Sequence, residues 1–399
     1  MEQQLGSSSF QGPEAVLNMQ PSSSIGIAYH PLFGSHPDLI LLELDDKLLP
    51  DLLLHQRVSL RGQPDEDAVL CTQSKTYAIK FVGTSNSALL VPPSHLYQLS
   101  QNSQHQEPDT IIPDDGKLIV PIIQVAPGNM ELLEVAPRLD KLKLLLSQKP
   151  YSYEEALEDM EKDDKTGLYR WPDLVDMVQA SNGELENGLM ALSALEIDGY
   201  WRIVDEEYMD MILRMLLQNS ILNEWSLDEL DEDEVVSVLV ADGFPCNIAR
   251  HCLHVYGSKV VDGTVGRNAW RLDARRVGVH FARAILRSGK MKMDNFMEEW
   301  LRKIPEGMNV SFSMLEGEVL TDKFGVETWV YAFRVSSLPS TPAERFAMLF
   351  RERSRWEWKD LEPYIRDLKV PGLSSEGLLL KYTRRTQPTA DAEPVFSAR

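Results

Sequence analysis

The sequence predicts an α+β multidomain protein in which short strands precede repeated helical units. Its length of 399 residues exceeds that of a typical single domain. Apolar residues form short or alternating runs before residue 139, and after it they recur at helical spacing. The hydrophobic content of 43% and charged content of 25% are those of globular proteins, so we expect most of the chain to fold.

The net charge of −21 is concentrated in the middle of the chain. Residues 151–249 contain 25 acidic and 5 basic side chains, whereas residues 250–303 contain 12 basic and 5 acidic ones. Residues 341–385 are also basic, with 10 basic and 7 acidic side chains. Because Lys and Arg drive phosphate binding, only the C-terminal part has the charge that suits a nucleic-acid backbone. The alternative explanation of this charge distribution is that the acidic and basic regions are two ordinary solvated faces.

Several classes of chemistry find no support in the sequence. The three cysteines, Cys71, Cys246 and Cys252, suit a reducing compartment rather than a disulfide framework. No signal peptide and no run of about eighteen apolar residues is present, so we expect a soluble intracellular protein without a membrane partner. The motifs GxxxxGK[ST], GxGxxG, HExxH and GxSxG are absent, and we therefore expect no enzyme activity, catalytic residue or cofactor.

The N-terminal part is expected to be a tail followed by a β domain. Residues 1–37 are rich in Gly, Ser, Gln and Pro, which predicts a disordered tail. Short apolar runs predict strands of a β-barrel portion over residues 38–137; these runs are 39–44, 57–61, 68–72, 76–82 and 88–91. The polar stretch 94–115 predicts a long loop. Segments 118–126 and 130–136 flank Pro127, Gly128 and Asn129 and predict a hairpin.

One predicted strand carries the candidate partner-binding residues. In the segment 76–82, Tyr77, Ile79 and Phe81 share one face because side chains alternate along a strand. About seven short strands could close into a barrel, or they could leave open edges that recruit strands of another chain. We expect a β structure shared with a partner.

After residue 139 a helix, a turn, a second helix and a β wing recur. The first example has helices at 171–179 and 184–195 joined by 180–183, with a β segment at 199–204. Middle helices of the others are expected to start near Ser226, Met293 and Trp358. Their third helices are expected at 248–256, 311–315 and 374–385, with wing strands at 269–272 and 329–335. This predicts winged-helix-like units at 138–205, 206–273, 274–339 and 340–399, with a generic helical bundle as the alternative.

Two clusters with metal-ligating side chains are expected to be structural. Cys246, His251, Cys252 and His254 point in different directions around a helix and cannot converge on one ion, so no metal site is predicted. The acidic run at 228–234 has no calcium-loop spacing, and it suits the solvated start of a helix.

Basic side chains point to DNA in two places. In the predicted helix 273–288, Arg276, Arg283 and Arg287 share one sector, and Lys290 follows. In the last unit, basic residues end the segment that would be a recognition helix. The predicted DNA-binding residues are Arg275, Arg276, Arg283, Arg287, Lys290, Lys381, Arg384 and Arg385. Their chemistry suits phosphates, so we expect sequence-nonspecific binding. The third helix of the first unit carries Glu184 and Glu186 instead and should not bind DNA.

A series of segments, in a shared order, carries a resemblance to a known family. They are LLELDDKLLPDL (41–52), AVLCTQSKTYAIK (68–80), TSN (84–86), GYWRI (199–203), PEGM (305–308), YIRDL (364–368) and LLLKYTR (378–384). Together they span roughly residues 40–385. In their order and spacing the chain resembles the Dcc-type sister chromatid cohesion proteins, an accessory subunit of the alternative, chromosome-transmission-fidelity form of the replication factor C clamp loader.

The resemblance implies a non-catalytic nuclear protein. Its β region would join the small subunit and the C-terminal segment of the large subunit of this clamp loader in a composite triple-barrel. Tandem winged-helix domains, usually counted as three in the family, would follow and bind single- and double-stranded DNA. The module would dock on the catalytic subunit of DNA polymerase epsilon, bring loading or unloading of PCNA to the leading strand, and support cohesion.

Two other hypotheses remain open from the sequence. The first is a winged-helix scaffold of the cullin or proteasome-lid type, with protein partners only. The second is a hydrolase that uses the acidic clusters, which divalent metals would activate. DNA binding that depends on salt distinguishes the preferred hypothesis from the first rival.

Overall fold

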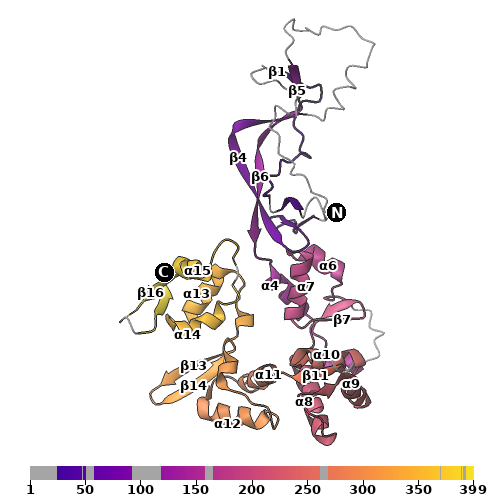
Figure 1. Ribbon diagram of the computed structural model, residues 1–399, viewed down its shortest axis with the longest axis vertical. Coiled ribbons are helices and arrows are strands. Elements are labelled where there is room, and N and C mark those ends of the chain that lie inside the picture. Colours follow the sequence, from indigo (N-terminus) through magenta and orange to yellow (C-terminus); the bar gives the residue numbers. More distant parts are fainter. Residues whose placement is uncertain are drawn as a thin grey trace, which may run out of the picture. The chain divides into compact units, whose positions relative to one another are not determined.

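The computed structural model describes residues 25–46, 48–50, 58–91, 118–157, 165–260, 268–368, 370–387, 389 and 392–399. These residues form a mixed α+β structure with several small sheets (Figure 1) and no closed barrel among the described strands. Their contacts divide the chain into two units. We call Met1–Pro50 with Ile79–Leu133 the sheet unit, and Asp51–Ala78 with Glu134–Arg399 the main unit.

The sheet unit contains a small parallel sheet and most of two long strands. In the small sheet, β1 (Ile25–Tyr29) pairs in parallel with β5 (Leu118–Ile122). The predicted tail therefore includes a strand, because the backbone of Ile25–Tyr29 pairs with that of β5. Residues 1–24 and the predicted loop at 94–115 lie outside the described residues. The two long strands are β4 (Thr76–Leu90) and β6 (Gln124–Val135), which are neighbours in a second sheet.

The predicted hairpin at Pro127 to Asn129 is wrong, because β6 continues through these residues. Among the described strands β6 lies at the end of its sheet, where a proline without an N–H donor is tolerated. Gly128 is required for close approach rather than for a turn, since a Cβ there would lie 2.2 Å from the Val82 carbonyl oxygen. The predicted strands 76–82 and 88–91 are parts of the single strand β4. Segment 39–44 forms no strand and contributes only a bridge from Leu42 to Met130.

In the main unit, β2 (Ser59–Arg61) and β3 (Val69–Cys71) extend the second sheet in the order β2-β3-β4-β6. The β3 strand pairs antiparallel with the start of β4, and Leu70 lies opposite Tyr77. Both side chains are buried, so this end of the sheet has a dry face.

The helices and strands that follow all lie in the main unit. In chain order they are α4 (Leu139–Ser147), α5 (Tyr153–Leu157), α6 (Trp171–Met177), α7 (Asn182–Ala191), β7 (Leu195–Ile197), β8 (Tyr200–Arg202), α8 (Glu206–Leu222), β9 (Leu230–Asp231), α9 (Glu232–Ala241), α10 (Cys246–Tyr256), β10 (Gly257–Lys259), β11 (Ala269–Leu272), α11 (Ala274–Leu286), β12 (Met291–Lys292), α12 (Met293–Lys303), η1 (Phe312–Leu315), β13 (Val319–Phe324), β14 (Glu327–Ala332), η2 (Val335–Ser337), α13 (Pro342–Glu352), β15 (Arg355–Glu357), α14 (Trp358–Leu361), η3 (Glu362–Tyr364), α15 (Ser375–Tyr382), β16 (Thr383–Thr386) and β17 (Val395–Ala398).

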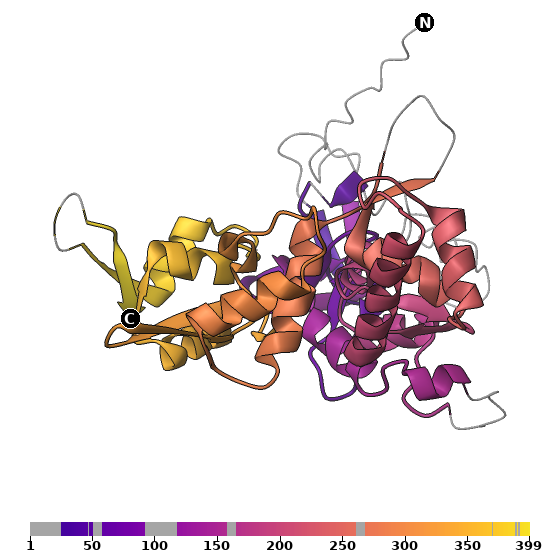
Figure 2. The same cartoon turned by 90° about the horizontal axis from the view of Figure 1, so that it is seen from below.

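From α8 onward, one order of elements recurs: helix, strand, helix, helix, strand, strand. We call α8–β11 the second repeat, α11–β14 the third and α13–β17 the last. In each sheet the final strand lies in the middle, giving the orders β10-β11-β9, β12-β14-β13 and β15-β17-β16. Elements α4–β8 form the first repeat, in which Trp201 of β8 also bridges to Tyr169. The colours from magenta to yellow follow this succession in Figure 2.

Local patterns predicted several of these elements closely. Predicted middle helices near Met293 and Trp358 begin at those residues, whereas the one expected near Ser226 begins at Glu232. The third helix expected at 311–315 is a single 3-10 turn. The third helix expected at 374–385 ends at Tyr382, because Thr383–Thr386 pairs with β17 as a strand.

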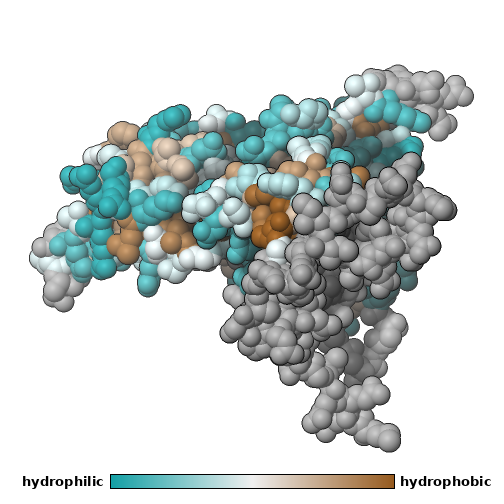
Figure 3. Space-filling model, turned by 90° about the horizontal axis from the view of Figure 1, so that it is seen from above, coloured by the Kyte–Doolittle hydropathy of each residue, from teal (hydrophilic) through white to brown (hydrophobic). Residues whose placement is uncertain are grey.

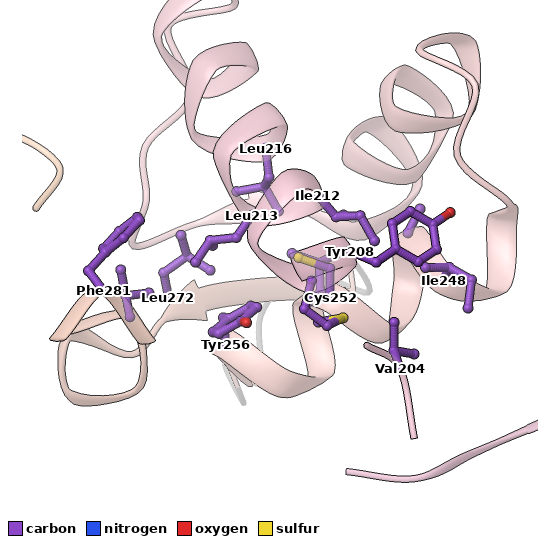
Figure 4. Packing of buried hydrophobic residues seen from close by; sticks show 14 of the residues in the cluster. Val204, Tyr208, Ile212, Leu213, Leu216, Ile248, Cys252, Tyr256, Leu272 and Phe281 are labelled. Atoms are coloured by element: carbon purple, nitrogen blue, oxygen red, sulfur yellow. The ribbon is translucent and has the colours of Figure 1, made fainter. Parts of the chain in front are cut away.

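One apolar core extends through the second and third repeats. Figure 4 shows Tyr208, Ile212 and Leu216 of α8 packed near Cys252 of α10 and Phe281 of α11. Leu142, Leu174 and Leu185 lie in a separate core of the first repeat, and Phe346, Trp356 and Phe396 lie in that of the last. The second and third repeats are therefore joined by packing as well as by the chain.

Candidate partner-binding and DNA-binding surfaces

The sheet unit leaves many large apolar side chains exposed. Among its described residues the buried apolar ones are few: Leu48, Val120, Ile122 and Ala126. The exposed ones are Ile27, Tyr29, Leu32, Phe33, Leu39, Ile40, Leu41, Leu44, Phe81, Val91, Val125 and Leu133. The hydropathy view in Figure 3 shows hydrophobic residues reaching the surface between hydrophilic ones. Apolar exposure of this extent is typical of a surface that binds another protein.

The three predicted partner-binding residues on β4 differ in how exposed they are. Tyr77 is only 7% exposed, Ile79 is half-buried, and Phe81 is 52% exposed. Phe81 lines a hollow of about 170 Å³ in the sheet unit, together with Leu39, Ile40 and Leu90. Tyr77 can therefore only support the sheet, whereas Phe81 is available for contact. The exposed apolar residues at 39–41 were missed as contact residues because their run was interpreted as a strand.

Polar groups anchor the start of β4 on the first repeat. Thr76 Oγ1 donates to Glu184 Oε2 at 2.6 Å and accepts from the Ser181 backbone N–H at 2.9 Å. The buried Arg61 guanidinium donates to the Ala180 carbonyl and to Asn182 Oδ1. Ser181 and Glu184 also form the capping box of α7. Glu184 thus has a structural role that the sequence did not reveal, because its partner lies 108 residues away.

Three of the predicted DNA-binding cations form ion pairs within the main unit. Arg283 donates to both carboxylate oxygens of Glu318, at 2.8 and 2.7 Å. Arg287 contacts Glu206 and Glu207 at 3.2 Å. Lys290 Nζ lies 2.6 Å from Asp322 and about 5 Å from the ring centres of Phe324 and Tyr331. These partners neutralise much of the positive charge that the predicted helix 273–288 would offer to phosphates.

The other two cations of α11 bind backbone carbonyl groups. Arg276 Nη1 donates to the Gly257 carbonyl oxygen at 2.8 Å, just past the end of α10. Arg275 Nε donates to the Met314 carbonyl oxygen at 3.2 Å. A cation near the C-terminal carbonyls of a helix is favourable. Both arginines therefore help to hold α11 against its neighbours.

The last repeat presents a different set of cations. Lys381 lies in the last turn of α15, whereas Arg384 and Arg385 are exposed on β16 and not on a helix as predicted. In the registers of the sheet, Arg384 and Arg355 both lie opposite Ser397, so their side chains project from the same face. Arg355 and Arg384 form no ion pair with any described residue. Arg355 was missed because only the strand register brings it beside Arg384.

The histidine, cysteine and acidic clusters have structural roles. Glu232 is buried and accepts hydrogen bonds from Trp270 Nε1 and Arg250 Nε, both at 2.8 Å. His254 stacks on Trp270, with 4.7 Å between ring centres. Burial raises the pKa of the Cys252 thiol. The acidic run begins α9 as predicted, and the Asp231 side chain accepts the Glu234 N–H. The start of this helix is not fully solvated as expected, because Glu232 is buried.

Two general features complete the description of these surfaces. Across the described ranges, no group of three or more His, Cys, Asp or Glu side chains is arranged to hold a metal ion. None of the helices in the same ranges has the length and apolar character needed to cross a bilayer.

The chain is a mixed α+β protein with repeated small units and several small sheets, which close into no barrel among the described strands. Over residues 39–365 it matches the family described as Sister chromatid cohesion protein Dcc1. The chain belongs to this family. Sister chromatid cohesion protein DCC1 of Homo sapiens is 33% identical over 350 residues, covering 87% of this chain and 85% of the human one.

Other relatives carry the same description. The protein of Danio rerio is 31% identical over 381 residues and 94% of each chain. The protein of Saccharomyces cerevisiae is 24% identical over 400 residues, which cover 91% of this chain and 97% of the yeast one. The family resemblance inferred from the segments between residues 40 and 385 is thereby confirmed.

Proposed function

We propose that this member of the cohesion family is a non-catalytic accessory subunit of the alternative replication factor C clamp loader. Its sheet unit combines with the small and large subunits of the chromosome-transmission-fidelity complex. Its helical repeats act as winged-helix domains that contact DNA and the catalytic subunit of DNA polymerase epsilon. The complex loads or unloads PCNA in the nucleus, and ATP hydrolysis takes place in other subunits.

The observation that carries this proposal is the exposed apolar surface of the sheet unit. Exposed Phe81, Ile27 and Tyr29 lie on or beside strands whose sheets close into no barrel among the described residues. Burying such side chains against a partner contributes roughly 25 cal/mol per Å² of apolar surface. Open strand edges also accept further strands.

Co-expression with the two clamp-loader subunits tests the partner surface. We expect Phe81→Asp to lose both subunits in affinity purification and gel filtration, because it places a charge in the apolar hollow. Lys80→Asp is the matched control, since this exposed side chain projects from the opposite face of β4. Retention of both subunits by Phe81→Asp would contradict the assignment of this surface.

DNA binding is assigned to the last repeat. Lys381, Arg384 and Arg385 form no ion pair with a described carboxylate, and Arg355 extends this group. Arg275 and Arg276 also have no carboxylate partner among the described residues, but both donate to backbone carbonyl groups. The recurring order of elements, with the last strand in the middle of each sheet, favours winged-helix domains. Backbone phosphates, and not base edges, are the proposed contacts.

A titration at several salt concentrations separates the two groups of cations. We expect Lys381→Glu, Arg384→Glu and Arg385→Glu together to abolish binding, whereas Arg287→Gln leaves it within about twofold. Unchanged binding in the triple variant would refute this assignment.

The alternative is a cullin or proteasome-lid type of scaffold with protein partners only. The ion pairs of Arg283, Arg287 and Lys290 favour it for the α11 surface, because these cations already have carboxylate partners. Wild-type chain that binds partner subunits but no DNA at low salt would establish this alternative.

A further inference from the structure

The segment between the third and last repeats carries the one Ser/Thr–Pro pair of the sequence, Thr341–Pro342. Proline-directed protein kinases require this dipeptide at an accessible position. Thr341 has φ −75° and ψ 127°, which is the extended conformation favoured before a proline. Its side chain is exposed, and Oγ1 donates a hydrogen bond to the Glu344 carboxylate. The hydroxyl group is therefore presented at the surface at the N-cap of α13.

The same segment contacts the first repeat through α4. The Ser340 N–H donates to Asp140 Oδ2 at 3.0 Å, and the Ser340 hydroxyl donates to the same oxygen. Lys143 Nζ donates to the Ser336 carbonyl oxygen. These polar bonds are exposed or half-buried, so their formation depends on the local charge.

We infer that Thr341 is a phosphorylation site and that its modification releases α4 from this segment. In the reaction, Thr341 Oγ1 forms a bond to the γ-phosphorus of ATP while the bond from that phosphorus to the β–γ bridging oxygen breaks. The hydroxyl proton passes to a carboxylate of the kinase, and ADP leaves. The kinase belongs to the proline-directed class, because Pro342 follows the acceptor.

The new charge acts on groups that are already in place. A phosphothreonine carries a charge of about −1.5 to −2. It no longer has the O–H group that donates a hydrogen bond to Glu344. Asp140 of α4 accepts a hydrogen bond from Ser340, the residue before Thr341. The negative charges of the phosphate and of Asp140 therefore repel each other and oppose the contact with α4. Lys143 lies on α4 one turn beyond Asp140 and donates to the Ser336 carbonyl in the same segment, so a phosphate on Thr341 would compete for this cation.

The helix itself tolerates the modification. A phosphate at the start of an eleven-residue helix is favoured by the helix dipole. The expected effect is therefore a change in the α4 contact and not loss of the last repeat. This goes beyond the proposed function, and it does not depend on DNA or on a clamp-loader partner.

The experiment exposes the full chain to a proline-directed serine/threonine kinase with ATP and maps the phosphate by mass spectrometry. We expect phosphate on Thr341 in the wild-type chain and none in Thr341→Val, which keeps the shape of the side chain. Pro342→Ala keeps the hydroxyl and should lose most of the incorporation. A synthetic peptide of residues 335–347 verifies that the kinase is active. If the kinase modifies the peptide but leaves Thr341 unmodified in the folded chain, the assignment of Thr341 as a phosphorylation site is wrong.

Hydrogen exchange of the Ser340 amide tests the release. We expect exchange to become about tenfold faster after phosphorylation, as loss of one hydrogen bond implies. Asp140→Ala should give the same increase without phosphate, and α13 amides should keep their protection in both samples. An unchanged Ser340 exchange rate at full Thr341 modification overturns the release.

Discussion

Thr76 illustrates how a single hydroxyl group can join two parts of a chain. It donates to Glu184 and accepts from the Ser181 N–H, so it links the start of β4 to the N-terminus of α7. Thr76 is only 1% exposed, and water cannot replace these bonds. Removing one member leaves buried polar groups unpaired, which costs more than the bond itself contributes.

Thr76→Val should therefore lower the free energy of unfolding of the main unit by about 1–3 kcal/mol. Valine keeps the shape and β propensity of threonine but has no hydroxyl group. Urea unfolding followed by far-UV circular dichroism measures the change. Thr84→Val is the control at an exposed position of the same strand. Equal midpoints for the two variants would show that the buried bonds carry no net stability.

At position 128 the strands β4 and β6 leave no space for a side chain, so only glycine fits. A Cβ there would lie 2.2 Å from the Val82 carbonyl oxygen and 2.9 Å from the Phe81 ring. Gly128→Ala should separate β4 from β6 and weaken binding of the clamp-loader subunits at least tenfold. Gly34→Ala, where a Cβ meets no atom within 4 Å, is the matched control in the sheet unit. Wild-type affinity in Gly128→Ala would contradict this role of the glycine.

At the scale of elements, hydrogen bonds between titratable side chains join α8, α10 and α11. His280 on α11 lies 2.9 Å from Asp210 Oδ1 of α8 through Nε2, and 2.9 Å from the Tyr256 hydroxyl of α10 through Nδ1. Burial lowers the pKa of His280, against the opposing effect of Asp210. Burial also lowers the pKa of His251 on α10 to about 4, and the neighbouring His254 adds to this effect.

These shifts predict how stability depends on pH. A histidine whose pKa is lowered by folding binds protons first in the unfolded chain, so the free energy of unfolding decreases as the pH falls from about 6.5 towards 4. His251→Gln with His280→Gln should flatten this dependence. Thermal unfolding between pH 7.5 and 4.5 measures it, and an unchanged slope in the double variant would place the titration elsewhere.

Elements set by local patterns were predictable, whereas those set by distant partners were not. The helices beginning at Met293 and Trp358 follow from apolar spacing within a few residues. The Pro–Gly–Asn segment of β6 has turn composition, but pairing with β4 overrides it. Among the site residues, the sector of Arg276, Arg283 and Arg287 on α11 follows from helical period. Their partners Gly257, Glu318 and Glu206 depend on tertiary packing, so the sequence could not reveal that these cations were already engaged.

At the scale of the whole molecule, the shared core makes the second and third repeats one cooperative structure. Trp300 of the third repeat is fully buried in the same cluster as Ile212 and Leu213 of the second. Its indole N–H donates to the Gly278 carbonyl oxygen at 2.8 Å. The core around Phe346 and Trp356 is a separate cluster, although it also includes Leu320 of β13.

Trp300→Ala should therefore destabilise both middle repeats together, by about 3–5 kcal/mol. Native-state hydrogen exchange measures the effect for each helix. Amides of α8 and α12 should lose protection to a similar extent, while those of α13 keep theirs. Loss confined to the third repeat would show that the two repeats unfold independently.

The strand β4 begins beside buried Tyr77 in the main unit and continues into the sheet unit past exposed Phe81. Its residues alternate between two faces, so adding or removing a single amino acid between these two would reverse the orientation of every side chain beyond that point. Related chains should therefore tolerate substitutions here far better than changes in length, and evolution of the partner-facing surface is restricted to exchanging one side chain for another.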